Sequence, residues 1–323
     1  MLQPLRNAFQ KYATTQTFIK EPTGLSTPID YFFGLGGKRV RPLLCLLSYQ
    51  LYRDDFKRAL PQALSVEMFH NFSLVHDDIM DEAPLRRGKK STHRRFGLNS
   101  AILSGDAMLI LTYQYLIKGF KDPKIVTVLR LFSKTALQIC RGQQYDMDFE
   151  SQTIVAIEDY LRMIKLKTAV LLGTSMALGG LRASATNKDI LLLRKCGISM
   201  GMAFQLQDDV LDAFGDPEKT GKQRGGDILQ NKKTFLYLKA LELGNQRTQM
   251  ELNTLFQPIQ IDADEKIRRV MEIYQALDVE RHANSLKNRF VQKGLQALEK
   301  VNAGSEKKIP LQELFDLLLD RDR

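Results

Sequence analysis

Apolar residues recur at spacings of three and four along most of the 323-residue chain. Leu60, Leu64 and Met68 form one such row, and Val128, Leu131 and Phe132 belong to another. This spacing predicts amphipathic helices, and no convincing run of alternating residues between turn pairs predicts strands. Helix breakers separate the periodic segments at residues 22–28, 34–37, 122–123, 216–217 and 303–305. The sequence therefore predicts an all-α fold of about ten or more helices.

The helical segments follow one another without a linker, a low-complexity tract or a repeat of fixed period. We therefore expect residues 1–323 to form one large single-domain bundle. The most apolar segment, residues 169–181, is too short for a membrane span and is expected to be a core helix. With no secretory leader in the first residues and with Cys45, Cys140 and Cys196 far apart in apolar surroundings, we expect a cytoplasmic protein with buried thiols.

The net charge of +10 agrees with a nucleic acid, an anionic membrane surface or a small polyanion as the partner. No nucleic-acid-binding motif accompanies the charge. The basic residues are scattered apart from short clusters at residues 38–41 and 86–90. A solvated basic surface therefore remains the alternative to a binding role until the acidic residues are considered.

Two acidic strings with the same spacing each follow an apolar helical stretch. Asp77, Asp78 and Asp81 form the first, and Asp208, Asp209 and Asp212 form the second. Residues four apart share a helix face, where crowded carboxylates repel one another. A divalent cation offsets that repulsion, and oxygen ligands of this kind suit Mg²⁺, which substrate phosphates usually help to coordinate. A duplicated string at helix ends is hard to explain as surface decoration.

With these strings the sequence resembles the trans-isoprenyl diphosphate synthases of the polyprenyl synthetase family. Other strings typical of the family stand in the expected order between about residues 30 and 240, at residues 36–42, 85–88, 104–106, 142–146, 167–168, 221–222 and 231–234. The resemblance implies a helical bundle of the isoprenoid synthase type with a central active-site cavity. It also implies a prenyltransferase that joins isopentenyl diphosphate to allylic diphosphates, works with three Mg²⁺ ions, and forms a homodimer.

The resemblance also assigns roles to individual residues. It implies metal ligation by Asp77, Asp81 and Asp208, with support from Asp78, Asp146, Asp209 and Asp212. Isopentenyl diphosphate is expected at Lys38, Arg41, His70 and Arg87, and the allylic diphosphate at Arg86, Lys167, Lys222 and Lys232. Thr168 and Gln205 are expected near the allylic cation, although plain packing on an apolar helix would also explain them. The bound metals and cations stabilise the departing diphosphate.

Product length is expected to depend on the helix that precedes the first acidic string. Ser73, one turn before Asp77, is small, whereas Phe69, two turns before it, is large enough to form a floor. Eight helical residues span about 12 Å, too short for a long polyprenyl tail. Phe72 occupies a position that often limits length in the family. The pattern resembles short-chain geranylgeranyl synthases and favours a C20 product, with C15 as the alternative and C30 or longer less favoured.

Three other functional classes stay open at this point. Terpene cyclases share the fold, but their second acidic motif differs and they need no second diphosphate subsite. A non-catalytic subunit of a heteromeric synthase typically lacks one acidic motif, and this chain has both. A basic helical protein that binds nucleic acid is the remaining alternative.

Overall fold

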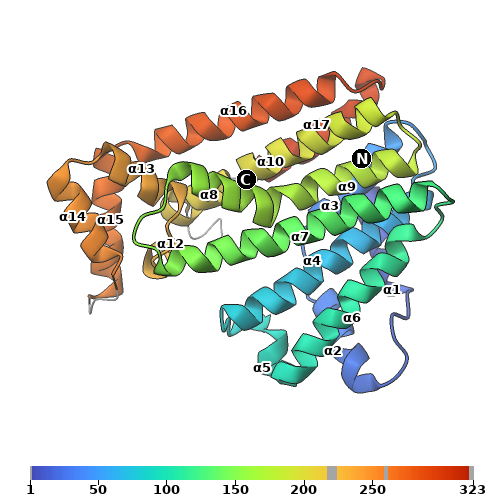
Figure 1. The fold of residues 1–323 in the computed structure, drawn as a ribbon, viewed down its shortest axis with the longest axis horizontal. Coiled ribbons are helices and arrows are strands. Elements are labelled where there is room, and N and C mark those ends of the chain that lie inside the picture. The colour runs from blue at the N-terminus through green and yellow to red at the C-terminus, as the bar shows by residue number, and fades with distance from the viewer. Residues whose placement is uncertain (1, 217–223, 258–260, 320–323) are drawn as a thin grey trace. The chain divides into compact units, whose positions relative to one another are not determined.

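The computed structural model describes residues 2–216, 224–257 and 261–319. Helices dominate these residues, which confirms the predicted all-α fold (Figure 1). The chain divides into two compact units. Unit 1 comprises Met1–Ser133, Thr174–Leu191 and Asn302–Leu311, and unit 2 comprises Lys134–Gly173, Leu192–Val301 and Gln312–Arg323. The expectation of a single domain stays a prediction.

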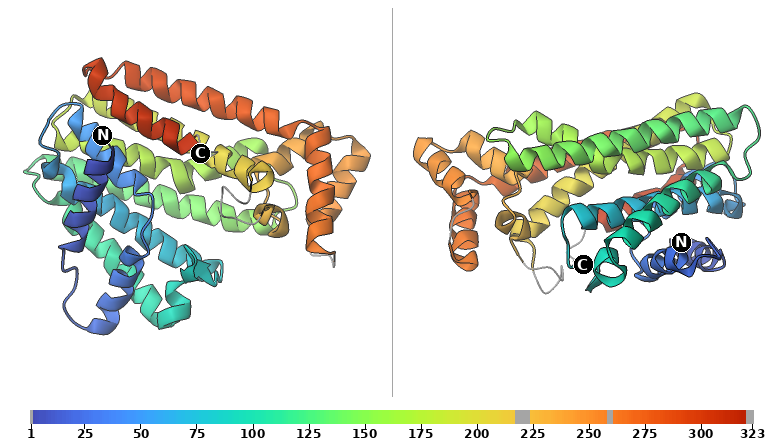
Figure 2. Two further views of the ribbon diagram at one scale, coloured as in Figure 1. Left: turned by 180° about the vertical axis from the view of Figure 1, so that it is seen from behind. Right: turned by 60° about the horizontal axis from the view of Figure 1, so that its bottom comes forward.

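Unit 1 is built around helix α4 (Leu60–Met80), which packs along α6 (Leu98–Ile117). The packing of these two helices can be followed from two further sides in Figure 2. Every residue from Gln62 to Phe69 is buried, so polar groups there need internal partners. The Gln62 amide donates to the carbonyl oxygens of Leu116 and Lys118 at 3.0 and 2.8 Å, where α6 ends. The other elements are α1 (Leu2–Thr14), α2 (Thr23–Gly34), α3 (Val40–Gln50), η1 (Phe56–Ala59), β1 (Leu85–Arg86), β2 (Lys89–Lys90) and α5 (Thr92–Phe96).

Unit 2 has its core among α8 (Ile157–Ile164), α13 (Phe235–Leu243), α15 (Ala263–Ala276) and α16 (Val279–Glu299). α14 (Gln246–Leu255) packs against α15, and both are drawn in orange in Figure 1. A π-helical turn, η2 (Lys165–Ala169), follows α8 directly, and α12 (Gly226–Leu229) is a single turn. Four longer helices contribute residues to both units: α7 (Lys124–Ser151), α9 (Val170–Arg182), α10 (Asn187–Phe214) and α17 (Ser305–Leu319).

Three local expectations differ from the structure. The segment 22–28, read as a breaker, contains the start of α2, with Pro28 inside the helix. Pro28 is the sixth residue of α2, so its ring costs the helix a hydrogen bond. A short hairpin, β1 with β2, is present although no strand was expected. Cys140 is exposed on α7, whereas Cys45 and Cys196 are buried as predicted.

Two stretches of the described residues are long and apolar enough to cross a membrane by length and composition alone. The stretch Ile157–Arg182 has 83% of its most apolar window buried inside the protein, as expected for the core helix predicted at residues 169–181. The other is α6, of which 39% is buried. Burial within the fold accounts for the apolar character of Ile157–Arg182. The exposed face of α6 is considered below.

Candidate active-site residues

The first acidic motif closes α4. Asp77 is half-buried, Asp78 is fully buried, and Asp81 is exposed at the C-cap, where its N–H donates to the Asp77 carbonyl at 2.9 Å. Arg86 Nε donates to Asp78 Oδ1 at 2.8 Å, and Arg86 Nη2 contacts the same oxygen. Burial raises the pKa of Asp78, although the Arg86 guanidinium acts in the opposite direction. The motif thus buries its middle carboxylate against a cation and leaves the outer two nearer the surface.

Arg86 reaches Asp78 because it lies in a tight hairpin. Leu85 pairs with Lys90 and Arg86 with Lys89, so Arg87 and Gly88 occupy the two turn positions. Both have positive φ, 54° and 75°, which is the geometry of a type I′ turn and suits Gly88 in particular. This turn gives consecutive arginines different partners, since Arg87 Nη1 donates to the carbonyl oxygen of Gly36. The division of Arg86 and Arg87 between two subsites stays a prediction.

Several cations of unit 1 lie around His70. The pKa of His70 falls well below its usual value, first because of burial and then because of Arg41, Arg87, Arg86 and Arg39. Burial also lowers the pKa of Arg41 to about 10, so this side chain stays charged at neutral pH. The structure therefore brings together three of the four residues predicted for isopentenyl diphosphate. The fourth, Lys38, is exposed in the turn before α3.

Arg39 has a different position from its neighbours Lys38 and Arg41. It is buried, donates to Glu67 Oε1 at 2.6 Å, and donates to the Phe33 carbonyl at 2.8 Å. A buried ion pair of this kind fixes the turn between α2 and α3 at a desolvation cost. Arg39 thus has a structural partner inside unit 1, which fits its absence from the predicted substrate-binding set.

The second acidic motif lies in the last two turns of α10. Asp208 is half-buried and Asp209 is buried. Tyr160 of α8 contacts Asp209 Oδ2 through its hydroxyl, and Gln205 Nε2 donates to Oδ1 at 3.3 Å. Burial and the nearby Asp227 raise the pKa of Asp209 to about 8. Here the middle carboxylate has neutral partners instead of an arginine.

Asp212, the last residue of this motif, holds the segment that follows. Its Oδ2 accepts the backbone N–H of Asp227 at 2.9 Å, and its carbonyl accepts the N–H of Gly225 at 2.8 Å. Lys232 lies 3.8 Å from Asp227, so unit 2 places a predicted substrate lysine beside this acidic segment. Lys222, also predicted to bind the allylic diphosphate, lies outside the described residues.

Lys167 and Thr168 lie in the π-helical turn η2. Such turns interrupt the regular helix and are frequent at functional sites. Gly142 of α7 allows the close approach of this turn, because a Cβ there would lie 2.2 Å from the Lys167 backbone nitrogen. Lys167 Nζ donates to Asp146 Oδ2 at 2.6 Å, and Thr168 Oγ1 donates to Gln205 Oε1 at 3.2 Å. Four predicted residues of unit 2 are thus joined in two contacting pairs.

The sequence model of the polyprenyl synthetase family matches residues 22–276. The chain belongs to the polyprenyl synthetase family. It is a trans-prenyltransferase of isoprenoid biosynthesis. It is 34% identical to the geranylgeranyl pyrophosphate synthase of Geoglobus acetivorans over 304 residues, 94% of this chain and 92% of that protein. It is equally 34% identical to the geranylfarnesyl diphosphate synthase of Aeropyrum pernix, over 93% of each chain.

The fold of this prenyltransferase is also that of solved relatives. A crystal structure of a geranylgeranyl pyrophosphate synthase superposes with a TM-score of 0.93 at 41% identity, covering 100% of this chain and 99% of the other. The geranylgeranyl pyrophosphate synthetase of Pyrococcus horikoshii Ot3 gives 0.91 at 30% identity, with 99% and 97% covered. The predicted fold of the isoprenoid synthase type is therefore confirmed.

The residues predicted to limit chain length lie on α4 of the prenyltransferase. Phe69 is 1% exposed, and its ring lies at 5.3 Å from that of Phe72 and 5.2 Å from that of Phe132 between centroids. Ser73 is half-buried and donates to the His70 carbonyl at 2.8 Å. The Phe69 side chain is thus packed inside unit 1 two turns before Asp77, and its role in limiting chain length stays a prediction.

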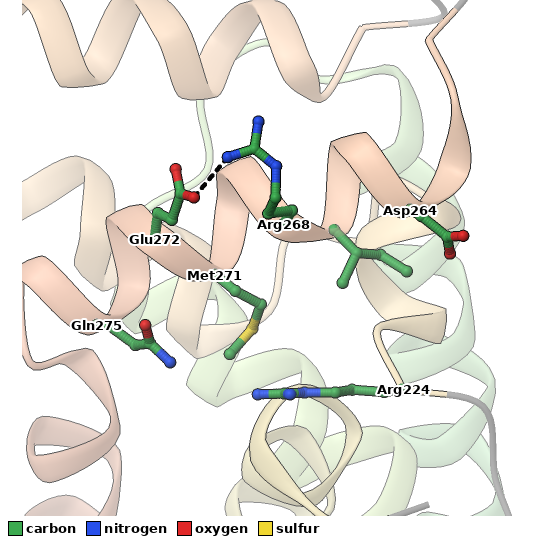
Figure 3. A pocket seen from close by; sticks show the side chains of 7 residues that line it. Arg224, Asp264, Arg268, Met271, Glu272 and Gln275 are labelled. Atoms are coloured by element: carbon green, nitrogen blue, oxygen red, sulfur yellow. Dashed lines mark hydrogen bonds and ion pairs between the residues drawn. The ribbon is translucent and has the colours of Figure 1, made fainter.

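Two surface cavities of this enzyme lie away from the predicted residues. One, of about 370 Å³, lies beside α15, where Met271 extends toward Arg224 and Arg268 pairs with Glu272 (Figure 3). The other, of about 430 Å³, lies in unit 1 between residues 49–58 and 182–184. Of the residues predicted for substrate or metal that the structure describes, none lines either cavity.

Three side chains at or near predicted site residues were not anticipated. Tyr160 and Asp227 lie close to Asp209, and Lys266 Nζ donates to Asn231 Oδ1 at 2.5 Å, next to Lys232. Lys266 lies on α15, in the part of the chain without a recognised motif. A lone tyrosine or lysine on an amphipathic helix carries no distinguishing pattern, so the sequence alone gave no means of finding them.

Proposed function

We propose that this prenyltransferase condenses isopentenyl diphosphate with dimethylallyl, geranyl and farnesyl diphosphates to give all-trans geranylgeranyl diphosphate. The observation that carries the proposal is the duplicated acidic motif. In each copy the middle carboxylate accepts hydrogen bonds from side chains of the same unit, Asp78 from Arg86 and Asp209 from Gln205. The name of the Geoglobus acetivorans relative supports the C20 product. The Aeropyrum pernix relative is named a geranylfarnesyl diphosphate synthase, which means a C25 product. A product assay therefore has to exclude C25.

Asp77, Asp81 and Asp208 would hold Mg²⁺. Their donor set is all carboxylate oxygen, which is what this cation prefers. Asp78 Oδ2, buried next to Asp77 in the first motif, has no hydrogen-bond partner within the described chain. Across residues 2–216, 224–257 and 261–319, no three acidic, histidine or cysteine side chains form a ready metal site. We therefore assign the remaining coordination to water and substrate diphosphate, as is usual for Mg²⁺.

When bound, Mg²⁺ would stabilise the negative charge that develops on the departing allylic diphosphate. The protein residues bind and orient the two substrates. The cations around His70 fit the oxygens of isopentenyl diphosphate, since an arginine presents paired donors to a phosphate. Arg86, Lys167, Lys222 and Lys232 would hold the allylic diphosphate, and Thr168 and Gln205 would lie by the allylic carbon. The carbocation formed by the condensation loses a proton to the departing diphosphate as the new double bond forms, so we assign no side chain as general base.

The two subsites can be separated by mutation. Arg41→Ala is expected to raise the KM for isopentenyl diphosphate more than that for the allylic substrate, because Arg41 belongs to the cation group around His70. Arg86→Ala should do the reverse or lower kcat. Arg281→Ala, which removes an exposed guanidinium of α16 that pairs with the N-cap residue Asp278, is the matched control. Equal changes for both substrates in both variants would contradict the assignment.

Product length is tested by chromatography of the products formed with each allylic primer. The wild-type enzyme should give mainly C20. Phe69→Ala should shift products to longer chains, because Phe69 is the fully buried ring of the aromatic group. Phe72→Ala should have a smaller effect, since Phe72 is only partly buried. Unchanged products in both variants and in the double variant would place the floor elsewhere.

We further propose that the enzyme is a homodimer that uses α6. Four large apolar side chains of this helix are between 38% and 62% exposed: Leu98, Ile102, Leu103 and Ile110. A second copy of the chain would remove this apolar face from water. Light scattering should give twice the chain mass of 36.9 kDa. Leu103→Glu combined with Ile110→Glu should give the monomer, and a monomeric wild type would rule the dimer out.

A further inference from the structure

Tyr160 begins a chain of side-chain hydrogen bonds in unit 2 that ends at Thr168. Its hydroxyl is buried against Oδ2 of Asp209. The other oxygen, Oδ1, accepts from Gln205 Nε2 at 3.3 Å, and Gln205 Oε1 accepts from Thr168 Oγ1 at 3.2 Å. Four side chains from α8, η2 and α10 thus form one continuous line.

The tyrosine hydroxyl determines which way this line runs. A phenol can donate or accept, so Tyr160 can pair with Oδ2 whether that oxygen carries a proton or not. When Asp209 is charged, or protonated on Oδ2, Oδ1 is left as an acceptor and takes its hydrogen bond from the NH₂ group of Gln205. Gln205 must then turn its carbonyl oxygen to Thr168, whose hydroxyl must donate. The lone pairs of the Thr168 oxygen consequently point away from Gln205 whenever Oδ1 is the acceptor.

We infer that Tyr160 is a positioning residue that acts through Asp209 to fix the amide of Gln205 and the hydroxyl of Thr168. The inference rests on the proposed function in one respect, namely that Thr168 and Gln205 lie by the allylic carbon. Fixed oxygen dipoles beside a developing cation stabilise it without reorganisation. With phenylalanine at this position, Oδ2 of Asp209 would lose its hydrogen bond, and the carboxyl group and the Gln205 amide that it orients would be free to turn.

The kinetic test is Tyr160→Phe. The kcat is expected to fall about 10-fold or more, as for the loss of one well-placed hydrogen bond in a transition state, while both KM values stay within about threefold. Tyr237→Phe is the matched control, since it removes a hydroxyl that donates to Asn253 at 3.0 Å in the same unit. Because Tyr160 acts through Gln205, Tyr160→Phe should add nothing to the loss in Gln205→Ala. An additive loss, or a rise in KM alone, would overturn the inference.

A second measurement does not depend on activity. In protein labelled with ¹⁵N-glutamine, the side-chain amide of Gln205, assigned by its loss in Gln205→Ala, should exchange slowly with solvent. Its exchange should be about 10-fold faster in Tyr160→Phe, in line with the loss of one hydrogen bond, and unchanged in Tyr237→Phe. Unchanged exchange in Tyr160→Phe overturns the positioning role. Absence of condensation by the wild type, with faster exchange in Tyr160→Phe, would reject the proposed function and leave the positioning intact.

Discussion

The two acidic motifs have the same spacing but are built differently. In both, the middle aspartate is buried: Asp78 is 0% exposed and Asp209 is 3% exposed. Asp78 is paired with Arg86, a cation eight residues away on a hairpin. Asp209 instead contacts the Tyr160 hydroxyl and the Gln205 amide, and its pKa rises to about 8. Identical sequence spacing thus yields a charged pair in one unit and a neutral network in the other.

This difference indicates what each middle carboxylate can do. A carboxylate beside a guanidinium keeps its charge more readily than one whose partners are neutral. Asp78 therefore fixes Arg86 electrostatically, which orients the hairpin that also carries Arg87. Asp209 fixes neighbouring polar side chains through hydrogen bonds. In both motifs the outer residues Asp77 and Asp208 remain partly accessible, so the metal role is assigned to them.

The largest effect on activity is expected at the metal-binding aspartates proposed in both motifs. Asp77→Ala and Asp208→Ala should each lower kcat/KM by about 10²-fold or more, because each removes a proposed metal ligand. Activity measured against Mg²⁺ concentration should show a higher metal requirement in both variants. Excess chelator should abolish wild-type turnover. Full turnover in chelator would contradict the metal role of both motifs together.

A smaller effect should distinguish the motifs by stability. Asp78→Asn leaves the guanidinium of Arg86 without its carboxylate and should cost about 1–3 kcal/mol of unfolding free energy. Asp209→Asn replaces a carboxyl whose partners are neutral and should cost less, about 1 kcal/mol. Urea unfolding at neutral pH in chelator measures both. Equal losses would mean that Arg86 contributes no more to its motif than Tyr160 and Gln205 do to theirs.

The sequence predicted the elements of this comparison but not the difference itself. The apolar spacing located the helices, and the acidic strings located both motifs. The hairpin that delivers Arg86 is local, and the string at residues 85–88 already indicated its importance. The contact from Tyr160 to Asp209 joins residues 49 apart, and it exists only because α8 and α10 pack together. Partners of buried groups depend on tertiary packing, which spacing along the chain does not encode.

Residues 22–28 and 38–41 show that tertiary packing also decides the structure of short local segments, which the sequence pattern alone does not predict. Pro22 and Pro28 indicated a break, yet the helix α2 includes Pro28, because burial of that side of the helix outweighs its local preference. Lys38, Arg39 and Arg41 are equivalent in charge, but the left-handed conformation of Arg39, with φ of 52°, turns it toward buried Glu67. A basic cluster in the sequence therefore does not reveal which of its members faces a substrate.

The last expected effect concerns the pH dependence of stability without metal. The pKa of Asp209 is about 8 in the folded chain, whereas an aspartate in an unfolded chain titrates near 3.9. Between these values the folded state holds a proton that the unfolded state has lost. Folding stability should therefore decrease as pH rises through this window, the contribution being complete below about pH 4 and lost above about pH 8.

Asp209→Asn removes the titrating group and should flatten this decrease. Urea midpoints measured in chelator at pH 5, 6, 7 and 8 would show it as a wild-type midpoint that falls more steeply than that of the variant. Asp208→Asn makes the same change at the neighbouring position. Because the Asp208 charge contributes to the raised pKa of Asp209, this variant should lessen the decrease without abolishing it. Because Arg86 opposes the effect of burial at Asp78, Asp78→Asn should alter the slope less than Asp209→Asn does. Parallel curves for wild type and Asp209→Asn would mean that the Tyr160 and Gln205 hydrogen bonds hold Asp209 charged, and that the two motifs are electrostatically alike.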